Sequence, residues 1–259
     1  MFYNKSQRQS EKGNVLFLIL IAVALFAALS YVVTQSTRSG SGSTESEKNL
    51  LSSAQMTQYP TALRTAVIRM ILGGTGVEQV HFDVPGSAFF TGTASTNLLV
   101  FHPNGGGASY QQAPADLSAT GQNSLSWYFN GNFYVPGIGT DGTSGGNDII
   151  AFLPGVSAGV CRKVNEELGI DPTSSTNSAN CSTQTTQYLP VMDSGIDIDN
   201  DVKVSMNDGY DFDAAMGSAI ALETVDGATC TVLNRQASGC FSDGASPASY
   251  TFYSVLLER

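Results

Sequence analysis

Charged side chains are scarce in this sequence. Asp, Glu, Lys and Arg together make up 13% of its 259 residues, about half the share that is usual for a soluble domain. Glycine is abundant instead, with 27 residues, and hydrophobic residues account for 42% of the chain. This composition favours an exported protein rich in strands and loops over a cytosolic enzyme, and its hydrophobic content is sufficient for a sizeable core.

Basic residues are fewer than acidic ones. The chain has 12 Lys and Arg against 22 Asp and Glu, which gives a formal net charge of −10. Residues 1–33 are net positive, so the remainder is more acidic than the whole chain. An acidic surface repels the phosphate backbone of nucleic acids. We therefore predict no nucleic-acid partner.

The sequence lacks a complete set of catalytic motifs. Residues 155–159, GVSAG, match the GxSxG pattern of a nucleophile elbow and lie between a predicted strand and a predicted helix. Both histidines, His81 and His102, precede Ser157, whereas in that fold the triad histidine follows the serine. We therefore expect Ser157 to cap the helix that begins near Val160, and we predict no enzymatic activity.

The longest hydrophobic run extends over residues 15–33 and contains no charged residue. At about 1.5 Å of rise per residue, a helix of this length matches the thickness of a bilayer core. Basic residues precede the run at Lys5, Arg8 and Lys12, and basic flanks stay in the cytoplasm. We predict one transmembrane helix over residues 14–33, with a cytoplasmic N-terminus and the rest of the chain outside.

Two other interpretations of this run remain open. A removable signal peptide has a similar charged start, and Ala28-Leu29-Ser30 is an acceptable small-x-small cleavage site. The run is nevertheless longer than the usual core of a signal peptide. A buried helix of a soluble domain is the weaker alternative, because the run is apolar on every side.

A basic leader ends in Glu11-Lys12-Gly13, directly before Asn14 and the apolar residues 15–19, VLFLI. This pattern resembles the start of a type IV pilin or a type II secretion pseudopilin. The resemblance implies that residues 1–13 are a leader, that a membrane peptidase cuts between Gly13 and Asn14, and that the new N-terminus is methylated. It also implies that the helix packs with other pilin-like subunits in a filament, where a β-rich head covers it.

The pattern departs from that family in three places. After the cut, the first residue is Asn14, where Phe or Met is usual, and the fifth is Leu18, where Glu is usual. In the family this Glu pairs with the N-terminal amine of a neighbouring subunit, and minor subunits can lack it. Pilins often continue the helix well past the membrane, but residues 34–43 read TQSTRSGSGS. Because Gly/Ser-rich segments are flexible, we predict a tether over residues 34–44.

These observations lead to a predicted function and two alternatives. The prediction is a non-enzymatic pilin-like envelope subunit in the bacterial inner membrane, assembling through its N-terminal helix and presenting a periplasmic or extracellular head. Its partners would be the membrane, a leader peptidase and other pilin-like subunits. The first alternative is a membrane-tethered or secreted binding or adhesion module without a filament. An extracytoplasmic hydrolase ranks last.

For the head, residues 45–259, we predict an α+β fold in which amphipathic helices pack on an antiparallel sheet. A capping box begins a helix over residues 45–59, and Pro60 begins a second, amphipathic stretch to Leu72. Asn130-Gly131 between aromatic segments predicts a hairpin. Further strands are expected near residues 97–102, 148–153, 219–224, 229–234 and 250–257.

The four cysteines are Cys161, Cys181, Cys230 and Cys240. An even number outside the cytoplasm indicates disulfides, and three pairings can connect four cysteines. We predict the local pairing, Cys161 with Cys181 and Cys230 with Cys240, since each bridge would close a polar loop. Loops of this size gain about 3 kcal/mol in the chain-entropy model.

An acidic stretch offers candidate metal ligands. Asp197, Asp199 and Asp201 alternate along the chain, and Asp208 is the twelfth residue counted from Asp197. This spacing is similar to that of the ligands in a calcium loop, although Val202 stands where that loop needs Gly. Some pseudopilins hold calcium in their heads. Apart from this calcium ion we predict no cofactor, and a solvated strand edge is the alternative interpretation of the stretch.

Overall fold

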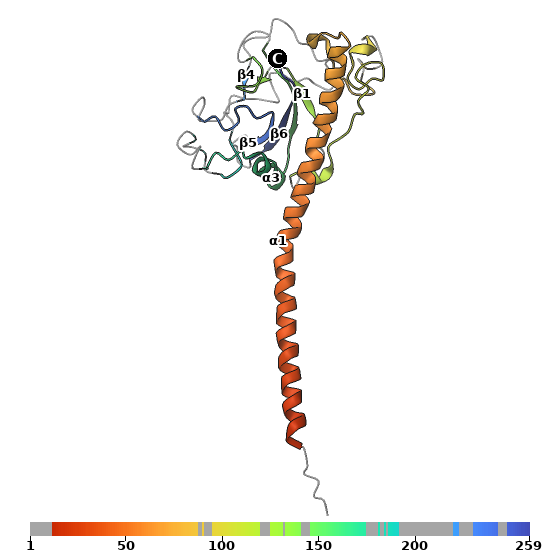
Figure 1. The fold of residues 1–259 in the computed structure, drawn as a ribbon. Coiled ribbons are helices and arrows are strands. Elements are labelled where there is room, and N and C mark those ends of the chain that lie inside the picture. Colours follow the sequence, from red (N-terminus) through yellow and green to blue (C-terminus); the bar gives the residue numbers. More distant parts are fainter. Residues whose placement is uncertain are drawn as a thin grey trace, which may run out of the picture. The chain divides into compact units, whose positions relative to one another are not determined.

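The computed structural model describes residues 12–87, 90, 95–119, 125–131, 133–140, 146–174, 181, 184, 186–191, 220–222, 230–242 and 248–259. The chain divides into two compact units, Met1–Lys48 and Asn49–Arg259. We call the second one the head unit and describe each unit by itself (Figure 1).

One long helix, α1, is assigned without interruption over Lys12–Leu72. It passes through residues 34–44, where the sequence predicted a tether, and through Pro60, where the sequence predicted the start of a second helix. Extending an existing helix adds one hydrogen bond per residue, whereas nucleating a new helix is unfavourable. The helix that flanks residues 34–44 on both sides therefore outweighs the unfavourable helix propensity of the glycines in this segment. Each glycine costs about 1 kcal/mol relative to alanine. The predicted break in secondary structure is not seen, and the flexibility of the segment stays a prediction.

The head unit contains a four-stranded sheet in the order β1-β3-β6-β5. These strands are β1 Tyr128–Asn130, β3 Ile149–Pro154, β6 Tyr250–Leu257 and β5 Ser238–Ser242. Every pairing between neighbours in this sheet is antiparallel. The α+β class with an antiparallel sheet is therefore confirmed.

Shorter elements surround this sheet. β2 Phe133–Tyr134 pairs in parallel with β4 Ile220–Ala221. The helix α3 spans Ala158–Leu168. Single turns of 3-10 helix lie at Val77–Gln79, Thr96–Leu98 and Ala115–Leu117.

The two faces of the sheet belong to two separate hydrophobic clusters. Along β3, Ile149, Ala151 and Leu153 pack in one cluster, while Ile150 and Phe152 pack in the other. This alternation follows from the two-residue period of a strand. Because both faces are buried, the sheet requires a layer on each side.

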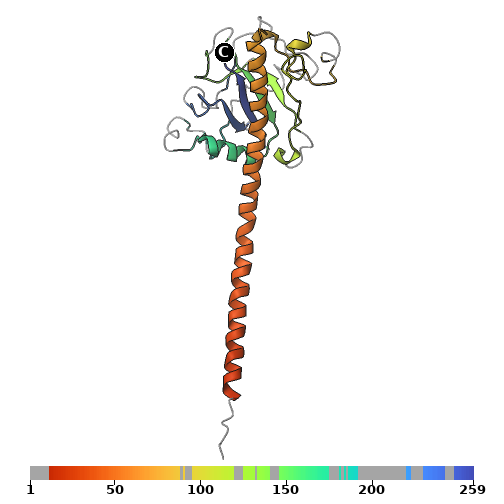
Figure 2. The same cartoon turned by 45° about the vertical axis from the view of Figure 1, so that its right-hand side comes forward.

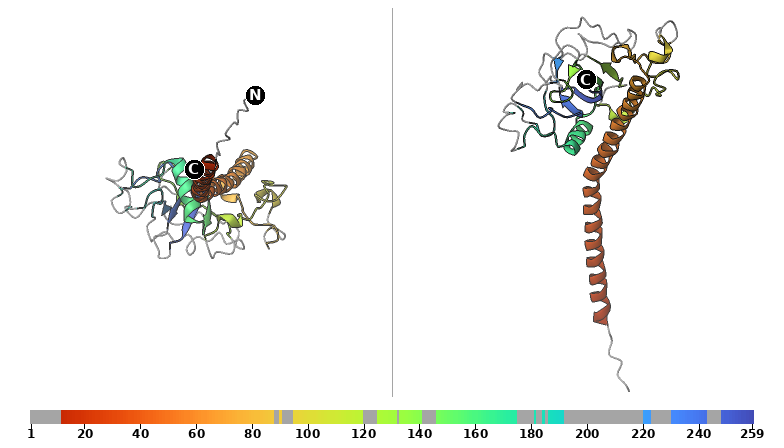
Figure 3. Two further views of the ribbon diagram at one scale, coloured as in Figure 1. Left: turned by 90° about the horizontal axis from the view of Figure 1, so that it is seen from below. Right: turned by 45° about the horizontal axis from the view of Figure 1, so that its top comes forward.

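Two helical segments cover the first face of the sheet. Within the head unit, α1 contributes Met56, Tyr59, Leu63, Ala66, Val67 and Met70 to this cluster. α3 contributes Val160, Cys161 and Val164. Both segments lie on the same side of the sheet (Figures 1 and 2), and the views in Figure 3 show α3 beside residues 49–72 of α1. The predicted apolar face of residues 60–72 is thus the face that contacts the sheet.

The hairpin predicted at Asn130-Gly131 is wrong. β1 pairs with β3 instead, and β2 pairs with β4. A two-residue hairpin of this type needs positive φ at both central residues, but neither Asn130 nor Gly131 is among the described residues with positive φ. Asn130 is buried at the end of β1. Tertiary packing of β1 into the main sheet has overridden the local turn signal.

Other strand predictions differ in outcome. The strands expected near residues 148–153 and 250–257 are β3 and β6, and β4 falls within residues 219–224. No strand is seen in the described part of residues 229–234. It forms a turn in which the backbone N–H of Asn234 donates to the backbone carbonyl of Thr231. Residues 97–102 form no strand, and their strand-like pairing is limited to an isolated bridge from Leu99 to His81.

Two disulfides are present, but the predicted pairing is wrong. Cys161 is bonded to Cys240, and Cys181 is bonded to Cys230, at sequence separations of 79 and 49. The local pairing fails because α3 packs on the sheet next to β5, which brings Cys161 to Cys240. The second bridge belongs to the cluster on the opposite face. Each face of the sheet is therefore tied by one covalent bond.

A buried side chain reinforces the first bridge. Asn165 on α3 is fully buried, and its Nδ2 donates to the carbonyls of Tyr188 at 2.8 Å and Cys240 at 2.7 Å. Its Oδ1 accepts from the Cys240 amide at 2.9 Å. The carboxamide thus pairs with Cys240 in both directions, as a neighbouring strand would. It satisfies backbone groups of β5 that would otherwise be buried without a partner.

We expect Asn165→Ala to lower the free energy of unfolding by about 2–3 kcal/mol, because buried backbone groups of Cys240 and Tyr188 lose their partner. Asn234→Ala is the matched control, since it removes an amide side chain from a turn and should change stability by less than about 0.5 kcal/mol. Thermal unfolding of the detergent-solubilised full chain measures both. If the two substitutions lower the free energy of unfolding equally, the hydrogen bonds of Asn165 contribute nothing to stability.

Candidate functional site

The first candidate is the apolar part of α1. Within the described part of the chain, Leu16–Val33 is the one segment long and apolar enough to cross a membrane, with a mean hydropathy of 2.8. Its large hydrophobic side chains are 40–76% exposed. Side chains of this kind on every side of a helix need a lipid or protein environment. Gly13 and Asn14, the predicted processing residues, belong to the first turn of α1.

The GxSxG serine has a structural role. Ser157 is the N-cap of α3, and its Oγ accepts a hydrogen bond from the Val160 amide at 3.4 Å. Gly169 ends α3 with φ of 71°, in the left-handed conformation that glycine adopts without strain. The predicted cap is therefore confirmed, and the described residues place neither His81 nor His102 in contact with Ser157.

The predicted calcium ligands lie outside the described residues. This holds for Asp197, Asp199, Asp201 and Asp208. Among the residues that the structure describes, no group of three or more His, Cys, Asp or Glu side chains is arranged to hold a metal ion. The calcium site therefore stays a prediction from sequence.

An aromatic core surrounds Trp127 and Phe129. Both side chains are buried, and the Tyr59 ring lies 5.3 Å from the Trp127 ring while Phe252 lies at 6.2 Å. Phe82 stacks on Phe129 with ring centres 4.4 Å apart. These rings join α1 of the head unit, the strands β1 and β6, and the loop before residue 84 into one layer.

A polar pair lies next to this aromatic layer. His81 and Asp83 flank Phe82, with His81 Nδ1 3.8 Å from Asp83 Oδ2. Among the described side chains, these two atoms are the buried polar atoms without a hydrogen-bond partner. Burial raises the pKa of the Asp83 carboxyl, while His81 and the backbone amide of Asp83 oppose this rise. The folded protein therefore holds a proton on Asp83 more tightly than a solvated carboxyl would.

The second candidate site is a cleft of the head unit with a volume of about 360 Å³. It lies between α1 and the segment that includes residues 111–114. Its lining residues are Gln55, Met56, Gln58, Tyr59, Ala62, Gln111, Gln112, Pro114 and Trp127. Met56, Tyr59 and Trp127 are buried, whereas the four glutamines are exposed. The cleft thus has an apolar floor and a rim of neutral amides.

A hydrogen bond fixes one wall of this cleft. The backbone amide of Gln111 donates to the Tyr59 hydroxyl at 3.2 Å. Burial raises the pKa of Tyr59 to about 12, and the bond from Gln111 opposes the rise. The hydroxyl therefore stays protonated near neutral pH and retains a proton that it can donate. Sequence reasoning missed this cleft, since residues 103–123 carry only the signal of a polar loop and nothing in them indicates contact with Tyr59.

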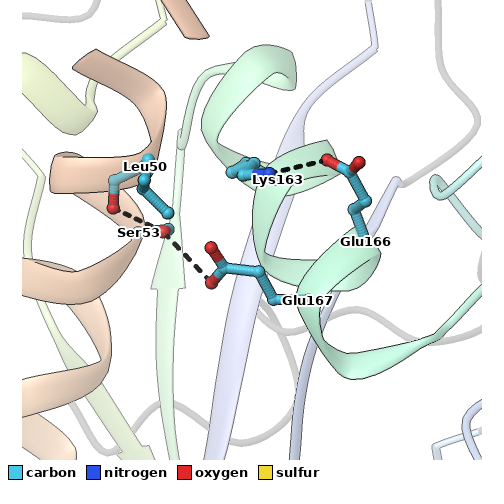
Figure 4. A network of polar contacts seen from close by, with 5 residues as sticks. All are labelled: Leu50, Ser53, Lys163, Glu166 and Glu167. Atoms are coloured by element: carbon cyan, nitrogen blue, oxygen red, sulfur yellow. Dashed lines mark hydrogen bonds and ion pairs between the residues drawn. The ribbon is translucent and has the colours of Figure 1, made fainter. Parts of the chain in front are cut away.

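A smaller polar network holds α3 to α1 within the head unit (Figure 4). The Ser53 hydroxyl donates to the Leu50 carbonyl at 2.7 Å and is 3.5 Å from Glu167 Oε2, while Lys163 pairs with Glu166 at 3.0 Å. Ser53 is buried and the two glutamates are exposed. Of these contacts, the one between Ser53 and Glu167 links the two helices, and the other two lie within one helix each.

No protein-family profile, curated protein or solved structure matches this chain.

We expect Asp83→Asn to raise the free energy of unfolding by about 1 kcal/mol at pH 7, because a buried charge is removed and the new amide can donate to His81 Nδ1. Burial raises the pKa of Asp83 in the folded state. The protonated carboxyl therefore stabilises the folded wild-type chain at low pH, and this stabilisation is lost as the pH rises through that pKa. The advantage of the Asp83→Asn variant over the wild-type chain should therefore shrink as the pH falls towards about 4.

Thermal unfolding of the full chain between pH 4 and pH 7 tests this expectation. Asp116→Asn provides the matched control, because Asp116 is exposed. A loss of stability in the Asp83 variant at all pH values would show that the buried carboxylate has a stabilising partner.

Proposed function

We propose that this chain is a pilin-like minor subunit of a bacterial envelope assembly, held by its N-terminal helix and without enzymatic activity. The observation that carries the proposal is helix α1. Its described part includes the predicted processing residues Gly13 and Asn14, contains the membrane-length segment Leu16–Val33, and ends in residues that cover an antiparallel sheet.

The helical assignment of residues 34–44 supports the proposal, because pilins often continue the first helix past the membrane. The sequence predicted a break over residues 34–44, whereas the helix is assigned through that segment. A helical segment of membrane length, followed in the head unit by helical residues that cover the sheet, supports the resemblance. Leu18 at the position usual for Glu agrees with a minor subunit, which can lack that carboxylate.

The properties of the head unit agree with a location outside the cytoplasm. All four cysteines are in disulfides, which persist in oxidising compartments. The basic residues that precede the apolar segment favour a cytoplasmic N-terminus. Together these features support a single-pass orientation with the head on the periplasmic or extracellular side.

The processing site gives the test of this proposal. We expect the protein taken from its native membranes to begin at Asn14 with a methylated N-terminus, and Gly13→Val to keep the whole leader, because a larger side chain should block the cut. Ser10→Ala is the control within the leader and should be processed normally. Intact mass and N-terminal sequencing determine the first residue of the wild-type protein and of both variants.

Two results would overturn the proposal in different ways. A wild-type protein that begins at Met1 is a plain signal anchor, and one that begins at Tyr31 is a secreted protein. Either result favours the alternative of a binding or adhesion module without a filament.

A further inference from the structure

The cleft of the head unit has the dimensions of a ligand site. Its volume of about 360 Å³ falls within the range of roughly 300–1,000 Å³ that is typical of small-molecule sites. Its floor is apolar, since Met56, Tyr59 and Trp127 lie there with 1%, 8% and 2% of their surface exposed. An apolar floor with a few polar groups around it is the usual arrangement of such sites.

The polar groups of the cleft come from two sides. Gln55 and Gln58 are three residues apart on α1, a spacing that places two side chains on the same face of a helix. Gln111 and Gln112 come from the segment that the Tyr59 hydroxyl anchors. Each amide offers one acceptor oxygen and two N–H donors.

The charge of the cleft restricts what it can bind. None of its described lining residues is charged, although the chain as a whole is strongly acidic. A phosphate or carboxylate ligand would find no cation here, and a cationic ligand would find no carboxylate. The cleft therefore suits a neutral ligand with many hydrogen-bonding groups.

We propose that this cleft binds a neutral saccharide. Each sugar hydroxyl both donates and accepts, as the amide groups of the rim do. The apolar C–H surface of a sugar ring suits a cleft that is lined by Met56, Tyr59 and Trp127. Tyr59 also carries a hydroxyl that can donate a hydrogen bond. This inference goes beyond the proposed function and holds whether or not the leader is removed at Gly13.

Trp127 provides a direct probe of the cleft. It is the one tryptophan of the whole chain, and it belongs to the cleft lining. A ligand that enters the cleft changes the environment of this side chain, so selectively excited tryptophan emission reports on the surroundings of this one residue. The full chain in detergent can be titrated with maltose, cellobiose, lactose and N,N′-diacetylchitobiose, and with the anionic 3′-sialyllactose for comparison.

We expect at least one of the neutral disaccharides to produce a saturable change in Trp127 emission, and 3′-sialyllactose to bind no better than lactose. Gln55→Ala and Gln112→Ala should each raise the Kd about fivefold, as the loss of one hydrogen bond would, and the double variant should raise it by about tenfold or more. Gln187→Ala is the matched control, because this exposed glutamine contacts Asp171 and is not part of the cleft.

The proposal fails if none of the four neutral disaccharides alters Trp127 emission or shows saturation-transfer signals in NMR. It also fails if the double variant binds with the same Kd as the wild-type chain. A neutral Ser/Thr-rich peptide that shifts the emission when no saccharide does would assign the cleft to a peptide and overturn the saccharide. None of these outcomes bears on the N-terminus of the protein, so they are independent of the processing experiment.

Discussion

The burial of strand β3 on both of its faces is the constraint on which the head unit depends. Five of its six residues are buried, and it lies between β1 and β6 in the sheet. Each face therefore needs its own covering layer. On one side this layer is formed by α1 and α3, and on the other by β2, Leu222 and the segments around Ile170 and Leu233. Both disulfides and Asn165 hold these layers in place, since each links a covering segment to the sheet or to another segment of the same layer.

Several parts of the fold could be predicted from local sequence. The strands β3 and β6, the helix α3 with its Ser157 cap and Gly169 end, and the apolar face of residues 60–72 all follow from hydrophobic period and capping chemistry. These features depend on neighbours within a few residues. The apolar segment Leu16–Val33 is visible in the sequence for the same reason.

The remaining features depend on contacts that are distant in sequence. The Asn130-Gly131 turn signal was overridden because β1 joined the main sheet beside β3. The cysteine pairing depends on which strand lies beside α3, and loop length alone cannot reveal that. The cleft combines α1 with the segment after Tyr110, and the hydrogen bond between Tyr59 and Gln111 makes them neighbours. Its glutamines come in two pairs that are far apart in the sequence, so nothing in the local pattern brings the pairs together.

The two disulfides are nested, because the bridge from Cys181 to Cys230 lies within the loop closed by Cys161 and Cys240. A protease that cuts the backbone once anywhere between Cys181 and Cys230 therefore releases no fragment, since the two ends remain joined through both bridges. Such a nicked molecule would keep its intact mass, apart from one added water, until a reducing agent separates the pieces. Wherever the protein meets a protease, this covalent arrangement allows the enclosed segment to be cleaved while the head unit stays one molecule.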